Sequence, residues 1–412
     1  MKNIIIIIFS LCLFSGVFAQ GEKRYVIKLK ENGVFTSADV TDRDQAQSSN
    51  SSQRKMKRDK AENIARGKGV NRILESFSDV AVGLVVEMNE TQAEALRADS
   101  DIESVIEDFI MQGRPRMQAR RPIMQGRPRM QEEYGYDIEA GTNCSIIEAG
   151  GGQRRNGAER NFIWIVDSGI DGNHDDLKSS INKSKKYAKS FVDNNPWKDD
   201  AGHGTFMAGI ASAESRPNGN EFAMNGIAPG VPTISLKVLD SNGEGFWSDI
   251  VLALDHVAQF GRRGDVVSMS LGAFGISNCA DSNPILSDAV KNVASKGIFL
   301  VMSAGNDSGD SNMNLPGCIT GENIFTIGSI DFNCQDGEGG CSSFSNLGSN
   351  VNWVAPGNPV FSTSPGNEYQ VWSGTSMSAA YVAGIIYASQ GSPAVAGTVS
   401  CGGRTYSIPK IR

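Results

Sequence analysis

The chain has 412 residues, of which 40% are hydrophobic and 21% charged, a balance that excludes wholesale disorder and allows two or three domains. The formal net charge of −7 gives the chain no general basic character, so a nucleic-acid partner is not expected. The charge is unevenly distributed. Residues 21–131 carry 20 basic and 17 acidic side chains (net +3), whereas residues 132–412 carry 18 and 29 (net −11).

The N-terminus has the layout of a secretory signal peptide. A lysine precedes an apolar run from Ile4 to Val17, and Val17-Phe18-Ala19 resembles a small-residue cleavage site. The alternative is a membrane anchor, but the run is short for a span and no later apolar stretch is long enough. We therefore expect removal of residues 1–19, a secreted, extracellular protein, and no membrane attachment of the mature form.

Six cysteines remain after the signal peptide, and an even number in an oxidising compartment predicts three disulfides. A metal cluster is the competing interpretation, but no Cys-x-x-Cys motif occurs and the chain has only three histidines. Sequence alone leaves the pairing open. The six residues are Cys144, Cys279, Cys318, Cys334, Cys341 and Cys401.

Residues 20–110 are predicted to form a small α+β unit. Strand, helix, strand, strand, helix, strand is the split βαβ order, which is typical of ferredoxin-like domains. Thr91 is the expected cap of the second helix. The ranges predicted from the residue pattern are strands at 25–29, 82–88 and 102–106, with helices at 54–65 and 92–98.

Residues 111–131 are interpreted as an arginine-rich linker that contains a processing site. Ile110-Met-Gln-Gly-Arg-Pro-Arg-Met-Gln118 recurs as Ile123 to Gln131, and two copies are too few for a repeat fold. Prolines oppose a continuous helix, so the linker is predicted to be extended and exposed. Its six arginines are opposite in charge to residues 132–412, which carry a net negative charge, and this attraction would help to retain the N-terminal unit.

From Phe162 onward, apolar runs rich in β-forming residues alternate with segments whose apolar residues have helical spacing. Strands are expected at 162–166, 233–239, 265–270, 298–302 and 324–328, and helices at 247–259, 284–295 and 376–388. Nearly continuous apolar strands with intervening helices predict an α/β fold with a mainly parallel sheet covered on both faces.

Three glycine-rich segments each carry one chemically useful side chain. Asp167 ends an apolar strand in IVDSGID, His203 stands between glycines in GHGTFMAGI, and Ser376 opens a helix in SGTSMSAAYVAG. Acyl transfer needs a nucleophile, a base and a group that orients the base, and these residues supply one of each. A serine at a helix N-terminus also lies among free N–H groups that favour a developing oxyanion.

Each of these residues also has a purely structural interpretation. Asp167 could cap a strand end, His203 could be a satisfied helix histidine, and Ser376 could be a plain N-cap. Their joint occurrence in one chain favours the catalytic interpretation. The remaining histidines, His174 and His256, lack such surroundings and are interpreted as surface or packing residues.

Taken together, the three segments resemble those of secreted subtilisin-like serine proteases that are made with an inhibitory propeptide. The order Asp, His, Ser is also that family's order, and the resemblance covers nearly the whole chain after the signal peptide. It implies a subtilisin-like three-layer sandwich for residues 132–412 and an inhibitor-like propeptide for residues 20–110. The implied function is serine endopeptidase activity through a covalent acyl-enzyme.

The resemblance assigns Asp167, His203 and Ser376 to the family's triad and Asn306, in Ser303-Ala-Gly-Asn306, to its oxyanion asparagine. Asn306 also lies in an Asn-Asp-Ser glycosylation pattern, but an asparagine lining a cleft would be poorly accessible to that modification.

The substrate of such a protease lies as an extended strand between two edge segments. The matching residues here are Gly243 and Gly245 on one side and Ser270, Leu271 and Gly272 on the other. Main-chain pairing of this kind gives affinity without fixing sequence. The first side-chain pocket would be lined by Ser303, Ala304, Gly305 and residues 270–272. These lining stretches contain no charged residue, which favours an apolar or broad preference over a trypsin-like one.

The resemblance implies no cofactor for the chemistry and no catalytic metal. Asp176 falls near a calcium-ligand position of relatives, but the proline usual beside it is absent from Asn173-His-Asp-Asp176, so a structural calcium ion remains an open expectation. Protein or peptide substrates and the chain's own propeptide are the expected partners, and a monomer is expected.

Some secreted relatives carry a bridge equivalent to Cys279–Cys318, and this pairing is therefore expected here. Cys334 and Cys341 are close enough for a local loop, which leaves Cys144 with Cys401. A Cys334–Cys401 bridge would overturn this scheme.

Activation is expected to begin in the precursor, with the residues after Ile110 running through the cleft. The candidates for the first pocket are Met117, Gln118, Met130 and Gln131, and a cut near Glu132 is favoured because it leaves a catalytic domain of family length. The alternative is a separate processing enzyme that cuts after Arg121 or Arg129.

Two other functions compete with a protease. An inactive binding protein on the protease fold would be expected to lose a triad member, and none is lost. A free protease inhibitor or folding chaperone would match residues 20–110 alone. Because these residues are covalently linked to a complete catalytic part, we expect them to inhibit or assist the folding of that part of the same chain.

Overall fold

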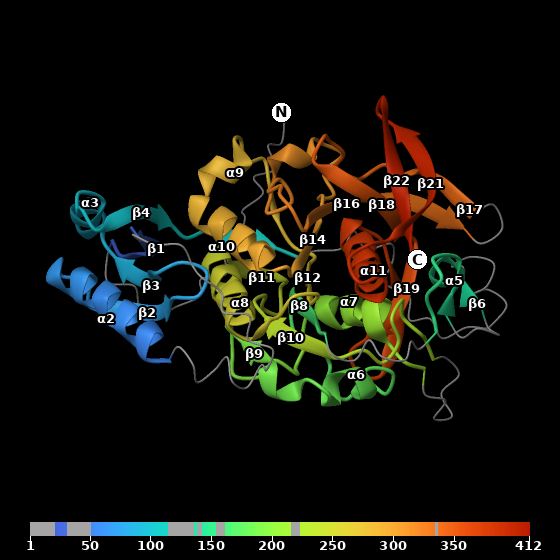
Figure 1. Cartoon of the computed structure of the whole chain (residues 1–412), viewed down its shortest axis with the longest axis horizontal. Helices are drawn as coiled ribbons and strands as arrows, with labels where there is room; N and C mark the ends of the chain where they lie inside the picture. Colours follow the sequence, from blue (N-terminus) through green and yellow to red (C-terminus); the bar gives the residue numbers. More distant parts are fainter. Residues whose placement is uncertain are drawn as a thin grey trace, which may run out of the picture.

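The computed structural model describes residues 21–30, 51–113, 136–137, 142–153, 161–215, 223–333 and 337–412. The predicted signal peptide, residues 114–131 of the linker and Cys334 lie outside the described residues. In Figure 1 a small N-terminal unit lies beside a larger α/β body. No helix within the described ranges is long and apolar enough to cross a membrane.

Within the described residues 21–30 and 51–107, the N-terminal unit is a four-stranded antiparallel sheet with two helices. Its strand order, β2-β3-β1-β4, matches the predicted ferredoxin-like arrangement, and β2 is the one strand of that arrangement for which no residue range was predicted. The elements are β1 (Lys23–Leu29), α2 (Ser51–Gly67), β2 (Arg72–Phe77), β3 (Gly83–Met88), α3 (Glu90–Arg97) and β4 (Ile102–Glu107).

The predicted cap of α3 is wrong by two residues. Asn89, not Thr91, is the N-cap: its side chain accepts a hydrogen bond from the Gln92 N–H, and the Gln92 side chain accepts one from the Asn89 N–H. This reciprocal capping box satisfies two otherwise free N–H groups. Thr91, two residues further along the chain, could not form the same pair of hydrogen bonds.

The α/β body contains a mainly parallel sheet in the order β17-β16-β14-β12-β8-β10-β9, with β18 pairing β16. Only the β16–β17 pair of this sheet is antiparallel among the described strands. The sheet strands are β8 (Ile163–Asp167), β9 (Lys189–Ser190), β10 (Thr233–Lys237), β12 (Val266–Met269), β14 (Phe299–Ser303), β16 (Ile324–Asn333), β17 (Gly337–Cys341) and β18 (Val351–Asn358).

Helices cover both faces of this sheet, as predicted. Along β8, Trp164 and Val166 pack with α8 and α10 on one face, whereas Ile163 and Ile165 pack with α7 and α11 on the other. This alternation is the two-residue period of a strand buried on both sides. The helices are α5 (Cys144–Glu148), α6 (Lys178–Asn182), α7 (His203–Ser212), α8 (Trp247–Phe260), α9 (Cys279–Ser282), α10 (Pro284–Ser295) and α11 (Thr375–Ala388), with 3₁₀ turns at Lys185–Tyr187 and Ser311–Met313.

Short two-stranded ladders complete the body. A hairpin formed by β21 and β22 ends the chain and packs on the sheet through Tyr406 and Ile408. The short strands are β5 (Ile110–Gln112), β6 (Tyr136–Asp137), β7 (Thr142–Asn143), β11 (Glu244–Phe246), β13 (Ala273–Phe274), β15 (Asn314–Leu315), β19 (Val360–Ser364), β20 (Glu368–Trp372), β21 (Ala394–Cys401) and β22 (Arg404–Lys410).

The disulfides are partly as expected. Cys279 is bonded to Cys318, which confirms that pairing. Cys341 is bonded to Cys401, so the pairings Cys334–Cys341 and Cys144–Cys401 are both wrong. The error has a tertiary cause, because the C-terminal hairpin folds back beside β17 and brings Cys401 to Cys341 across 60 residues. Cys144 is itself disulfide-bonded.

The N-terminal unit docks through its sheet onto α8 and α10, which lie next to it in Figure 1. One carboxylate oxygen of Asp255, on α8, accepts hydrogen bonds from three backbone N–H groups. The N–O distances to Ser78, Asp79 and Val80 are 3.1, 2.5 and 3.0 Å. Since a carboxylate on the larger body meets a turn of the smaller one, this contact joins the two parts directly.

A buried ionic cluster marks the other end of the same interface. The Arg24 guanidinium lies 2.8 Å from Asp108 and 2.6 Å from Asp249, at the start of α8. It also stacks over the Phe246 ring, with its central carbon 4.3 Å from the ring centroid. Arg24 thus pairs with Asp108, which directly follows β4, and with Asp249 of the α/β body.

Candidate active site

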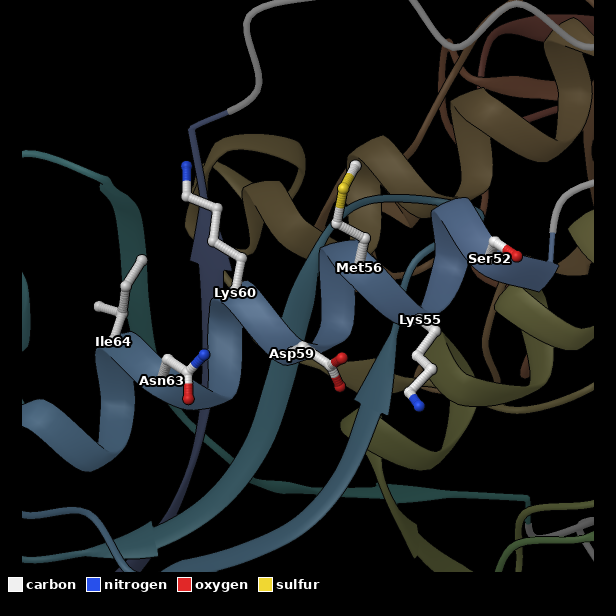
Figure 2. Close-up of a pocket in the computed structure, with 7 residues that line it drawn as sticks. All are labelled: Ser52, Lys55, Met56, Asp59, Lys60, Asn63 and Ile64. Atoms are coloured by element: carbon white, nitrogen blue, oxygen red, sulfur yellow. The ribbon is translucent and has the colours of Figure 1, made fainter.

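Two hollows of the structure differ in what lines them. The larger, of about 700 Å³, follows the outer face of α2, and all its lining side chains among the described residues come from that one helix (Figure 2). The second, of about 450 Å³, is lined by residues from several strand ends, including Ser270, Ser303, Asn306 and Ser376. The second hollow therefore brings together several of the residues that the sequence singled out, and we call it the cleft.

Asp167 and His203 form a buried carboxylate–imidazole pair. Asp167 stands at the carboxyl end of β8, and His203 is the first residue of α7. His203 Nδ1 lies 2.8 and 2.9 Å from the two Asp167 oxygens, and both residues are 1% exposed. Burial lowers the pKa of His203, but the Asp167 charge and hydrogen bond raise it, and the net pKa lies above the ordinary value.

Two residues that the sequence analysis missed hold this pair in place. The Asp199 carboxylate accepts hydrogen bonds from the Gly202 and Thr205 N–H groups at the start of α7, each 2.8 Å long. The Trp372 ring stacks on the imidazole, with centroids 6.3 Å apart and planes 16° apart. Asp199 could have been predicted from the sequence, because an aspartate just ahead of a helix is a typical capping residue. Nothing in the sequence pointed to Trp372.

Ser376 lies in the first turn of α11 and belongs to the cleft lining. Its Oγ donates a hydrogen bond to the Ser270 carbonyl at 3.3 Å, and the Ser270 hydroxyl donates to the Ser376 carbonyl at 3.0 Å. His203 Nε2 is buried and has no hydrogen-bond partner within the described ranges. The serine therefore points to a neighbouring carbonyl, while the imidazole nitrogen that could take its proton has no partner among the described residues.

The Asn306 side chain is fixed by the residue that precedes the serine. Its Oδ1 accepts hydrogen bonds from the Thr375 N–H at 2.8 Å and from the Thr375 hydroxyl at 3.0 Å. With Oδ1 engaged in this way, the Nδ2 group is left to donate to another acceptor. Asn306 and Ser376 line the same cleft, so the Nδ2 group can donate to the oxygen of a carbonyl group that reacts with the serine.

If Asn306 stabilises an oxyanion, Asn306→Ala should lower kcat by about 10²–10³ with little change in KM, because the donor acts mainly in the transition state. Steady-state kinetics on a peptide substrate would measure this. Asn312→Ala is the matched control, since Asn312 lies nearby on an exposed turn and bonds only to Asp310 and Ser349 among the contacts described. A KM increase at unchanged kcat would contradict the assignment.

The cleft is occupied by the chain's own residues 110–113. Strand β5 pairs antiparallel with β11, and Gln112 bridges to Gly272 on the other side. The Gln112 N–H donates to the Gly272 carbonyl at 3.0 Å, the Gly272 N–H donates back at 2.8 Å, and the Gly113 N–H donates to the Gly243 carbonyl at 2.9 Å. Both predicted edge segments thus hold an extended strand between them, and the residues just after Ile110 enter the cleft as expected.

Most of the predicted substrate-binding residues meet in this cleft. Ser270, Leu271, Gly272, Ser303 and Gly305 line it, and Gly243 and Gly245 lie along β5 on the opposite side. A Cβ on Gly245 would approach the Val238 carbonyl oxygen to 1.9 Å, so only glycine fits there.

Two residues differ from the expected lining. Ala304 is fully buried and packs with Ile330 and Val354 behind the cleft. Asp307 lines the cleft, so a charged side chain is present there that the sequence analysis did not count.

His174 and His256 take packing roles. His174 is fully buried with its Nε2 at 3.0 Å from the Glu368 carbonyl, and the His256 ring packs against Phe260 at 4.7 Å. Burial lowers the pKa of His256 to about 4, so this ring is neutral.

The Asp176 side chain is buried and accepts hydrogen bonds from the Met224 N–H and the Tyr369 hydroxyl, both 2.7 Å long. Within the described ranges no group of three or more His, Cys, Asp or Glu side chains could hold a metal ion. The calcium expectation therefore stays a prediction.

The two parts of the chain match different family models. The family model "Subtilase family" matches residues 160–390, and the model "Peptidase inhibitor I9" matches residues 24–113. The chain is 32% identical to an intracellular serine protease of Paenibacillus polymyxa over 54% of this chain and 64% of that protein. It is 36% identical to a thermophilic serine proteinase of Bacillus sp. (strain AK1) over 57% of this chain and 54% of that protein.

Thermitase of Thermoactinomyces vulgaris is 36% identical over 56% of this chain and 75% of that protein. Among solved structures, a cold adapted subtilisin-like serine proteinase is 28% identical over 57% of this chain and 77% of that one, with a TM-score of 0.47. The chain spans roughly half to three quarters of the length of these relatives. The family model covers more than half of the chain, and its segment holds Asp167, His203, Asn306 and Ser376 together, so the chain belongs to the subtilase family and carries a peptidase inhibitor I9 domain ahead of it.

Proposed function

We propose that the protein is a secreted serine endopeptidase, made as a zymogen, that hydrolyses peptide bonds through Asp167, His203 and Ser376. The observation that carries the proposal is the buried Asp167–His203 pair, next to a cleft that contains Ser376 and Asn306 and holds an extended peptide. All the reacting groups are side chains of this one chain, so the proposed chemistry needs no cofactor.

The reaction begins when Ser376 turns from the Ser270 carbonyl toward His203 Nε2. Ser376 Oγ bonds to the substrate carbonyl carbon as its proton passes to Nε2, and the Asp167 carboxylate stabilises the imidazolium. Asn306 Nδ2 and the free N–H groups of α11 bind the resulting oxyanion. The imidazolium then protonates the leaving amine to give the acyl-enzyme, and water repeats the steps to release the acid.

Secretion and latency rest on different observations. The N-terminal signal-like sequence and the two described disulfides support an oxidising, extracellular location. The I9 domain and the strand β5 in the cleft support inhibition by the chain's own propeptide, residues 20–110. Cutting at or near Glu132 would release a catalytic domain of residues 132–412, which we expect to be a monomer.

The test is covalent labelling combined with sequencing of the mature form. A serine-directed phosphonate should inactivate the secreted protein and label Ser376, and the mature N-terminus should lie in residues 114–132. Retention of peptidase activity after stoichiometric labelling of Ser376 would exclude the mechanism.

The pH dependence of catalysis follows from the raised pKa of His203. The imidazole must be neutral to accept the serine proton, so kcat/KM should increase with pH through that pKa. We expect the midpoint of the acid limb to lie above about 6.5, the ordinary value of histidine. A pH–rate profile measures it, and a midpoint clearly below this value would contradict the assigned influence of Asp167.

The pH dependence of propeptide retention has its own origin. Burial raises the pKa of Asp255 and of Asp108 to about 6, because docking removes both carboxyls from water. A raised carboxyl pKa means that the docked state binds protons more strongly, so docking should be tighter at pH 5 than at pH 8 and weaken as the pH rises through about 6. The fraction of cleaved propeptide retained on size-exclusion chromatography measures this.

Two variants of Asp255 separate charge from hydrogen bonding. Asp255→Asn removes the buried charge but keeps an acceptor for the N–H groups, so it should reduce the pH dependence to the part that Asp108 contributes. Asp255→Ala removes the acceptor and should weaken retention at every pH. Asp288→Asn is the matched control, because that carboxylate pairs with Lys28 at the interface but is 39% exposed. An unchanged pH dependence in Asp255→Asn would contradict this origin.

A further inference from the structure

The segment that fills the cleft is the first part of a repeated sequence. Residues 110–118, IMQGRPRMQ, recur without change at residues 123–131. The cleft holds the first four residues of the first copy, as β5 and Gly113. The second copy lies outside the described residues, but its sequence is identical at every position.

The cleft discriminates at two positions of this segment. The Met111 side chain is completely buried, in the apolar cluster that includes Leu239 and Trp247. A Cβ on Gly113 would approach Leu239 Cδ1 to 2.5 Å and His203 Nδ1 to 3.6 Å, so a larger residue would require the wall beside the imidazole to move. Apart from a hydrogen bond between the Gln112 and Glu244 side chains, the other hydrogen bonds described for this segment are made by the main chain, which any residue can make. The cleft therefore favours methionine followed two residues later by glycine.

The second copy offers the same two residues in the same spacing, as Met124 and Gly126. We propose that residues 123–126 are a second cleft-binding segment, which exchanges with residues 110–113 and keeps the cleft occupied when the first copy leaves it. The proposal deepens the zymogen function proposed above and rests on it.

The exchange does not require the N-terminal unit to leave the α/β body. With the second copy in the cleft, residues 110–122 would form a loop after Phe109, whose carbonyl accepts the Trp247 N–H at 3.1 Å. The entropy cost of closing a loop grows only with the logarithm of its length, and a proline- and arginine-rich segment suits an exposed loop. The first copy needs no such loop, so it should be the more populated of the two.

Disulfide trapping can measure which copy lies in the cleft. Gln112 is directly opposite Glu244 in the β5–β11 register, and Gln112 Nε2 is 3.2 Å from Glu244 Oε1, so cysteines at these positions can bridge. The full-length chain carries Ser376→Ala to prevent self-cutting and Glu244→Cys as the fixed partner. Three versions receive Gln112→Cys as the reference, Gln125→Cys for the second copy, or Ala119→Cys as the matched control between the copies.

We expect the Gln125→Cys chain to bridge at least about tenfold faster than the Ala119→Cys chain under mild oxidation, although Ala119 is closer to the cleft along the sequence. Adding Gly113→Val should speed Gln125→Cys bridging, because it disables the first copy, and adding Gly126→Val should return it to the Ala119→Cys rate. Peptide mapping of the Cys279–Cys318 and Cys341–Cys401 bridges verifies folding of each variant.

The proposal is overturned if Gln125→Cys bridges no faster than Ala119→Cys, or if Gly126→Val has no effect on its rate. It is also overturned if the Gln112→Cys reference does not bridge, since the strand register would then be wrong. Bridging reports occupancy of the cleft in an inactive chain, so it is independent of the covalent-labelling test of the catalytic assignment.

Discussion

Replacing Ser376 with alanine should reduce peptidase activity by about 10⁶, the loss known for removal of the serine in subtilisin. Ser376 is the hydroxyl that lines the cleft together with Asn306 and follows the Thr375 that fixes the asparagine amide. Without its Oγ no acyl-enzyme can form, and water would have to attack the substrate directly. Hydrolysis of a peptide substrate by the purified variant measures the loss.

The same variant should accumulate as an unprocessed precursor if the first cut is made by the protein itself. Ser378→Ala is the matched control, because Ser378 lies in the same helix but donates its hydroxyl to the Ala355 carbonyl in the core. This control should retain processing and most of its activity. Trimming of the Ser376→Ala precursor near Glu132 with no other protease present would mean that a separate enzyme makes the cut.

Replacing Asp167 with asparagine should lower kcat by about 10⁴. The carboxylate lies within 2.9 Å of His203 Nδ1 and is fully buried, so in the proposed mechanism it sets the tautomer that leaves Nε2 available as a base. The amide keeps the shape but can donate toward Nδ1, which favours the wrong tautomer, and it cannot stabilise the imidazolium. Kinetics under saturating substrate measure the loss in kcat.

Asp200→Asn provides the matched control for this replacement. Asp200 is close to His203 in sequence, but its side chain is 39% exposed and pairs only with Lys198 among the described contacts. Such an exposed pair contributes little to stability, so activity should stay within about twofold of the unchanged chain. Equal losses in the two variants would show that the effect is general electrostatics and not orientation of the imidazole.

The sequence by itself indicated the family, the order of the two domains and the side chains that we propose for the reaction. Short motifs did this because each one combines a local backbone requirement with one reactive group, as in His203 between two glycines at the start of α7. The apolar strands of the sheet could also be predicted from the sequence, since strands that are buried on both faces consist mainly of apolar residues. The role of residues 110–113 in the cleft followed from the same resemblance.

Only the tertiary structure decided which distant groups meet. Cys401 bonds to Cys341 because the C-terminal hairpin folds back on β17, and chain proximity had favoured a different partner. Trp372 reaches the His203 ring from a strand far along the chain, and Asp307 enters the cleft lining through the loop after Asn306. The sequence specifies local conformation and reactive groups, whereas contacts between segments far apart depend on how the chain packs around a shared core, which no local pattern records.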